Sequence, residues 1–135
     1  LRLEAGFPLY GHELSEEISP LQAGLKWSVD LSKKDFVGKE ALIEQFHDTT
    51  KPLVKYFRVK GRRIPRAGSI ISDSHTQVGK TLSGGYSPCA GQPIGSALIN
   101  AKIGAKQGDT YFADVRGSEV EISTCAPILR ELQKK

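Results

Sequence analysis

The sequence predicts a mixed α+β protein that is mostly β, and two observations lead to this prediction. Residues 1–50 are rich in turn-forming residues and contain one clear helical pattern. From residue 51 onward, six short apolar runs alternate with turn signals built from Gly, Asp and Ser. Strands at this close spacing, with little helix between them, are typical of a small antiparallel barrel or sandwich.

The first part of the chain predicts short, irregular elements before its helix. Residues 7–12 contain Pro and Gly and are expected to form a loop. Ser19 followed by Pro20 predicts a short helix with Ser19 as its N-cap. Apolar and polar residues alternate over residues 25–29, a pattern that favours a half-buried strand.

One longer helix is predicted over residues 38–46. This segment contains good helix formers. Asp35 lies just before it and is a plausible cap. The apolar residues that fall mostly on one face of this helix are Ala41, Leu42, Ile43 and Phe46.

The second part of the chain predicts six strands. They are expected at Val54–Val59, Ser69–Ser72, Val78–Leu82, Ile94–Ile99, Thr110–Val115 and Val120–Thr124. The pair Gly84-Gly85 is expected to end the third strand. The last two strands are separated by Arg116-Gly117-Ser118, which predicts a hairpin loop.

Composition excludes several classes of protein. The chain is 39% hydrophobic and 25% charged, and no apolar run is long enough to cross a membrane. Its net charge of +4 is spread over short clusters. Such an excess is usual for a solvated surface, although it would also favour a polyanionic ligand or an acidic partner.

No zinc-binding spacing or nucleic-acid-binding signature is present, and Cys89 and Cys125 are expected to be reduced thiols. The three histidines are expected on the surface.

The beginning of the chain predicts that it is a piece of a longer polypeptide. It starts with Leu1-Arg2-Leu3-Glu4, and the sequence contains no methionine. Local sequence alone favours a surface or capping role for Glu4. Its carboxylate could also accept two hydrogen bonds from a heterocyclic ligand that presents adjacent donors.

Several segments, in order along the chain, resemble the glycine-cleavage aminomethyltransferase (T-protein) family. Leu82 departs from the Thr that is usual in the family, and Ile128 departs from the usual Phe. The similar segments are Leu1–Gly6 (LRLEAG), Leu9–Gly11 (LYG), Ser19–Trp27 (SPLQAGLKW), Asp35–Leu42 (DFVGKEAL) and Val78–Pro88 (VGKTLSGGYSP).

This resemblance implies a three-domain transferase that uses tetrahydrofolate. Such an enzyme takes an aminomethyl group from the lipoylated carrier protein (H-protein), passes the one-carbon unit to tetrahydrofolate and releases ammonia. Residues 1–50 would be the C-terminal tail of the folate-binding domain, and residues 51–135 the C-terminal β-barrel domain. The family's catalytic aspartate would lie upstream of Leu1, so the fragment alone would be inactive. The bacterial cytoplasm or the mitochondrial matrix is the expected location.

Two alternatives remain open at this point. The chain could belong to a related folate-dependent demethylase or dehydrogenase. It could also be a non-catalytic relative that binds folate or another protein.

The resemblance also implies candidate folate-binding residues. Glu4 would contact the pterin, and Lys33 would lie near the glutamate tail, with a solvated turn as the competing interpretation. Arg66 would bind a carboxylate or hold backbone carbonyls between domains, and the second role is favoured. Arg130 is a second candidate for binding the tail. The rings of Tyr10 and Trp27 could stack on the ligand, although such rings are more often part of a core or a pocket wall.

Overall fold

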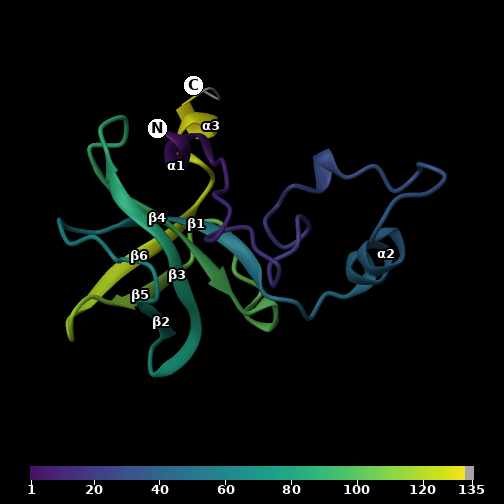
Figure 1. Cartoon of the computed structure of the whole chain (residues 1–135). Helices are drawn as coiled ribbons and strands as arrows, with labels where there is room; N and C mark the ends of the chain where they lie inside the picture. Colours follow the sequence, from purple (N-terminus) through teal and green to yellow (C-terminus); the bar gives the residue numbers. More distant parts are fainter. Residues whose placement is uncertain (133–135) are drawn as a thin grey trace.

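A closed six-stranded antiparallel barrel makes up most of the computed structural model, which describes residues 1–132 (Figure 1). The order around the barrel is β1-β4-β3-β2-β5-β6, and pairing between β1 and β6 closes it. The prediction of a mostly β chain with an antiparallel barrel is confirmed. The strands are β1 (Leu53–Val59), β2 (Ile70–Asp73), β3 (Thr76–Ser87), β4 (Gln92–Ile99), β5 (Thr110–Asp114) and β6 (Glu119–Cys125).

The third predicted strand is longer than expected. β3 continues through Gly84 and Gly85 instead of ending there. Gly84 lies opposite Gly95 of β4, and a Cβ on Gly84 would come within 1.8 Å of the Pro65 carbonyl oxygen. The prediction that this glycine pair ends the strand is therefore wrong. At Gly84, the missing side chain permits a close approach of backbone.

The predicted hairpin between β5 and β6 is confirmed. The Val115 N–H donates to the Ser118 carbonyl at 2.8 Å, and the Ser118 N–H donates back at 3.2 Å. Arg116 and Gly117 have φ angles of 56° and 76°. Positive φ at both central residues is the property of a type I′ turn, whose twist matches that of the paired strands.

The hydrophobic core fills the inside of the barrel. Alternate residues of the strands point inward, as the burial pattern of β6 illustrates. The buried residues of this cluster are Phe57, Val59, Ile71, Val78, Ala97, Ile99, Ala105, Tyr111, Ala113, Val120 and Ile122.

The first fifty residues lie outside the barrel. A short helix, α1 (Arg2–Ala5), packs beside α3 (Ile128–Leu132), so both ends of the described chain meet at one end of the barrel (Figure 1). The chain then runs along the barrel wall and out to α2 (Lys39–His47), which lies in a protruding lobe at the right of Figure 1. A second apolar cluster attaches this segment to the wall: Ile18, Ala23, Val54 and Leu82, with Leu14, Leu25 and Leu98 beside them.

The predictions for this outer segment are only partly correct. The helix over residues 38–46 is confirmed, but its N-cap is Gly38, at φ 86°, and no side chain caps it. Asp35 is therefore not the cap. Ser19 Oγ accepts the Gln22 N–H at 3.3 Å, as an N-cap does, but only a single turn follows.

The strand predicted over residues 25–29 is wrong. The structure has a 3₁₀ helix, η1 (Lys26–Ser28), at this position. Both the N–H and the hydroxyl of Ser28 donate to the Leu25 carbonyl, at 2.9 and 2.7 Å. These local bonds close a turn. A second 3₁₀ helix, η2 (Ala101–Ile103), follows β4.

We expect Gly84→Ala to lower the free energy of unfolding by about 1–3 kcal/mol, because the new methyl group collides with backbone that has no room to move. Gly85→Ala is the matched control, since a Cβ there meets nothing within 4 Å. It should change stability by less than about 0.5 kcal/mol. Urea denaturation followed by circular dichroism measures both, and equal effects would contradict the close-approach explanation.

Candidate functional site

One buried carboxylate fixes the N-terminal segment to the barrel. The Glu13 side chain is completely buried. Its Oε1 accepts a hydrogen bond from the Ser96 hydroxyl on β4. Its Oε2 accepts the Leu9 N–H at 2.9 Å and Arg2 Nη1 at 3.2 Å. A single side chain thus joins α1, the loop after it and the barrel wall.

Arg2 extends this network to the neighbouring strand. Its Nη2 donates to Ser83 Oγ on β3 at 3.0 Å, and Nη1 also reaches the Phe7 carbonyl at 3.3 Å. His12 Nδ1 lies 2.8 Å from the Leu82 carbonyl and 3.4 Å from Ser83 Oγ. Because a carbonyl only accepts, Nδ1 carries the proton in this contact. His12 is therefore partly buried against β3, which corrects its prediction as a surface residue.

The network keeps Glu13 ionised. Burial alone would raise the pKa of this carboxyl, because it removes water from the charged form. The hydroxyls of Ser83 and Ser96, the Leu9 N–H and the Arg2 charge oppose burial and hold the pKa below its ordinary value. A buried carboxylate that accepts this many bonds stabilises one arrangement of the segments around it.

Glu4 makes a second bridge between α1 and the barrel. Its side chain is 5% exposed. Oε1 accepts the Ser87 hydroxyl at 2.6 Å and the Cys89 N–H at 3.2 Å, both at the end of β3. Oε2 lies 3.4 Å from the Leu1 amino nitrogen. The hydrogen bonds from Ser87 and then Cys89 lower the pKa of Glu4 from 4.5 to about 2.

The four predicted folate-binding residues do not gather at one place. Glu4 on α1 and Arg130 on α3 share one end of the barrel, because these helices pack together (Figure 1). Lys33 is exposed in the lobe before α2. Arg66 is exposed in the loop between β1 and β2, where Nη1 donates to the Gly84 carbonyl at 3.5 Å. This contact joins Arg66 to a backbone carbonyl within the barrel. Folate binding by these residues stays a prediction.

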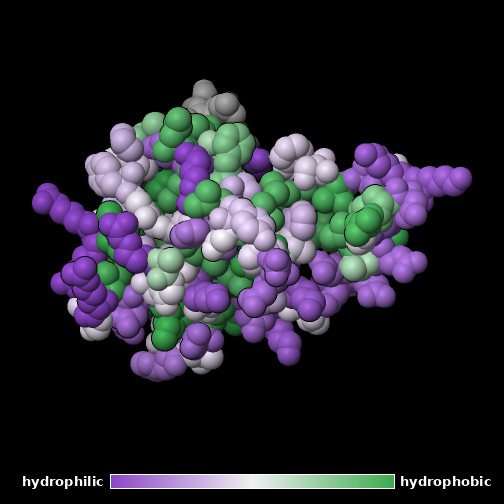
Figure 2. Space-filling view, viewed as in Figure 1, coloured by the Kyte–Doolittle hydropathy of each residue, from purple (hydrophilic) through white to green (hydrophobic). Residues whose placement is uncertain are grey.

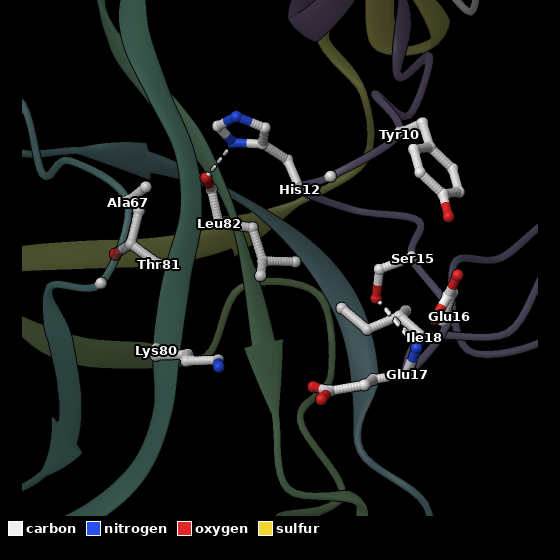
Figure 3. Close-up of a pocket in the computed structure, with 12 residues that line it drawn as sticks. Tyr10, His12, Ser15, Glu16, Glu17, Ile18, Ala67, Lys80, Thr81 and Leu82 are labelled. Atoms are coloured by element: carbon white, nitrogen blue, oxygen red, sulfur yellow. Dashed lines mark hydrogen bonds between the residues drawn. The ribbon is translucent and has the colours of Figure 1, made fainter.

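A polar cavity of about 520 Å³ lies between the outer segment and β3 (Figure 3). Lys80 and Glu17 point toward one another across it from opposite walls (Figure 3). None of the four predicted folate-binding residues lines it. The lining residues are Tyr10, Gly11, His12, Ser15, Glu16, Glu17, Ile18, Ala67, Gly68, Lys80, Thr81 and Leu82.

Several aromatic rings of the first fifty residues are exposed. Trp27 is 75% exposed, Tyr10 69% and Phe7 64%. Neither Tyr10 nor Trp27 belongs to either apolar cluster of the described chain. Apolar residues also reach the surface of the lobe around α2, where Figure 2 shows them beside charged ones. Exposed rings on a segment that is held firmly to the barrel provide flat apolar surface for contact with another group.

Sequence reasoning missed the two residues at the centre of the network. Arg2 lies within the LRLEAG segment that carries the family resemblance, and Glu13 lies two residues after the LYG segment. Their location in or beside these segments was the sequence feature that could have identified them as candidate residues. No local sequence pattern predicts the hydrogen bond between Ser96 and Glu13, because the two residues are 83 positions apart.

We expect Glu13→Gln to lower the free energy of unfolding by about 1.5–3 kcal/mol, since it replaces a charged acceptor with a neutral amide. Glu17→Gln is the matched control because Glu17 is exposed, and it should change stability by less than about 0.5 kcal/mol. Thermal and urea unfolding of both variants measure the difference. If Glu13→Gln were as stable as the Glu17→Gln control, the hydrogen bonds of Glu13 would not anchor the N-terminal segment.

Glu4 should make stability depend on acid pH. Its pKa is depressed on folding, so its contribution is present above about pH 4.5 and is lost as the pH falls toward 2. The stability difference between the wild type and Glu4→Gln should therefore shrink across this window. Urea unfolding between pH 2 and 6 measures it, and a difference that stays constant with pH would exclude the depressed pKa.

The comparisons with known proteins agree with the fold. The family model described as the glycine cleavage T-protein C-terminal barrel domain matches residues 53–129. The crystal structure of glycine cleavage system aminomethyltransferase T from Bartonella henselae is similar with a TM-score of 0.87 and 26% identity. The match covers 95% of this chain and 36% of that chain.

Curated relatives are similar over both parts of the chain. An aminomethyltransferase of Mycobacterium leprae is 36% identical over 135 residues, which is 100% of this chain and 37% of the relative. One from Chlorobium luteolum is 38% identical over 119 residues, or 87% of this chain and 32% of the relative. This chain therefore spans about a third of their length. It belongs to the glycine cleavage T-protein family, because the model of that family's C-terminal barrel domain matches more than half of the chain.

Proposed function

We propose that this chain is part of an enzyme that moves a one-carbon unit from the aminomethyl group of a lipoylated carrier protein to tetrahydrofolate, with release of ammonia. Membership of the T-protein family and the names of the curated relatives support this reaction. The catalytic aspartate would lie in a preceding part of the complete polypeptide, and the chain alone would have no turnover. The bacterial relatives favour the cytoplasm over the mitochondrial matrix.

Within that enzyme, the chain would form one wall of the folate site. The observation that carries this role is the exposure of Tyr10 and Trp27 on a segment that Glu13 and the second apolar cluster attach to the barrel. Rings held in place in this way suit stacking against the flat rings of a folate. Orienting the ligand in this way lowers the entropic barrier to reaction between two bound groups.

The four charged residues predicted to bind folate would have different roles in this site. Oε1 of Glu4 already accepts two hydrogen bonds within the chain, so a pterin donor would reach Oε2. Lys33 and Arg130 are exposed cations that suit the carboxylates of the glutamate tail. The Arg66 contact with the Gly84 carbonyl supports a structural role for that side chain.

Within residues 1–132, no helix is long and apolar enough to cross a membrane. The proposed partners, tetrahydrofolate and the H-protein, are those that the family resemblance implies.

The complete polypeptide that contains this chain should produce 5,10-methylenetetrahydrofolate and ammonia from tetrahydrofolate and aminomethylated H-protein. Trp27→Ala should raise the KM for tetrahydrofolate about 2- to 12-fold, which corresponds to the loss of one aromatic pair. Trp27→Phe keeps a ring and should retain most of the affinity. Absence of the product from the wild type would refute the reaction, and an unchanged KM in Trp27→Ala would remove this ring from the site.

A further inference from the structure

A second hollow lies where the lobe that carries α2 meets the barrel. It has a volume of about 350 Å³, which is within the usual range for small-molecule sites. Its walls come from the outer segment, the end of α2, the start of β1 and η2. None of the residues proposed for the folate site lines it. The lining residues are Ser19, Leu21, Gln22, Lys26, Gln45, Phe46, Asp48, Thr49, Lys51, Leu53 and Ala101.

Hydrogen bonds fix the wall that the outer segment forms. Gln22 Nε2 donates to the Pro52 carbonyl at 2.9 Å, and Gln22 Oε1 accepts the Ser19 N–H at 3.2 Å. The Val54 N–H donates to the Gln22 carbonyl at 2.9 Å, which joins this wall directly to β1. These bonds use only groups of the chain itself, so the hollow is already formed before a ligand enters.

Apolar side chains make up much of the lining. Phe46 on α2 is 41% exposed and Leu53 on β1 is 38% exposed. Leu21 and Ala101 are half-buried beside them. Apolar surface that water still reaches inside a hollow gains free energy when an apolar group covers it. A matching ligand therefore has an apolar body, and the ring of Phe46 favours an aromatic one.

One cation of the hollow is held beside this apolar surface. Lys26 Nζ lies 4.0 Å from the centre of the Phe46 ring, in a cation–π contact. The only carboxylate of the lining belongs to Asp48, and hydrogen bonds from Thr50, together with the charge of Lys51, hold its pKa below the ordinary value. Lys51 thus offsets the charge of Asp48, and Lys26 is left to pair with one ligand anion.

Gln45 adds a hydrogen-bonding group that the described chain does not use. Its Oε1 is buried and has no hydrogen-bond partner within residues 1–132. A buried carbonyl oxygen in this state costs free energy that a donor recovers. The Gln45 side chain is half-buried and lines the hollow, so rotation about its own bonds brings this oxygen to a ligand hydroxyl.

We propose that this hollow binds a small aromatic carboxylate that carries a hydroxyl group on its ring. The ring packs against Phe46 and Leu53, and the carboxylate pairs with Lys26. The hydroxyl donates to Gln45 Oε1. Asp48 disfavours ligands with a second carboxylate, because like charges repel one another. The site is independent of the proposed folate reaction.

NMR titration of the ¹⁵N-labelled chain with 4-hydroxyphenylacetate tests the site. Amide signals of the lining residues should shift, with a dissociation constant of about 1–10 mM for a ligand of this size. Phenylacetate lacks the hydroxyl, and 2-(4-hydroxyphenyl)ethanol lacks the carboxylate. Each should bind about two- to fivefold more weakly, since each loses one polar contact. Equal affinity for the three compounds, or shifts that do not map to the hollow, would overturn the proposal.

Two variants assign these contacts to side chains. Lys26→Gln should bind the carboxylate and the alcohol equally well, and Gln45→Met should no longer distinguish 4-hydroxyphenylacetate from phenylacetate. Lys34→Gln is the matched control, because Lys34 is an exposed lysine of the same lobe that lies outside the hollow, and it should keep both preferences. A Lys26→Gln variant that still prefers the carboxylate, or an equal loss in Lys34→Gln, would refute the assigned pairing. Unchanged melting curves confirm that the variants are folded.

Discussion

The carboxylate of Glu13 is the interaction on which the arrangement of this chain depends. It has no exposed surface and accepts bonds from the barrel, from the following loop and from α1. A buried charge left without these partners would be strongly destabilising, so the segments that supply them are held in one arrangement. The proposed stacking role of Tyr10 and Trp27 depends on such attachment, because a ring on a loose segment would not orient a ligand.

The barrel supplies the other half of that anchor. Closure by pairing of β1 with β6 removes free strand edges and fixes the register of every strand. Ser83 and Ser96 are directly opposite in the β3–β4 pairing, and this register brings Ser83 to Arg2 and Ser96 to Glu13. Gly84 and Gly95, the next pair, allow Pro65 and Phe57 to approach. The two glycines that permit close packing therefore lie directly beside the two serines that contact Arg2 and Glu13.

The sequence predicted the barrel well because its strands are short, apolar and separated by turn residues. It predicted the outer segment less well. Residues 25–29 alternate like a strand but have local hydrogen bonds that close a turn, and alternation alone does not show whether a partner strand exists. The glycine pair of β3 was predicted to be a turn, because no local sequence pattern shows that Pro65 packs closely against Gly84. Of the candidate site residues, Glu4 was singled out, whereas Arg2 and Glu13 were not.

The sequence by itself determined the mostly β class, the six strands, the hairpin between the last two strands and the family resemblance, because these follow from local pattern and from motifs. Only the tertiary structure decided which carboxylates are buried, that Glu4 meets Ser87 and that Glu13 meets Ser96. It also decided that the outer segment, the end of α2 and the start of β1 line one hollow. Contacts between residues far apart in the chain depend on barrel closure and strand register, and neither is encoded in any short stretch of sequence.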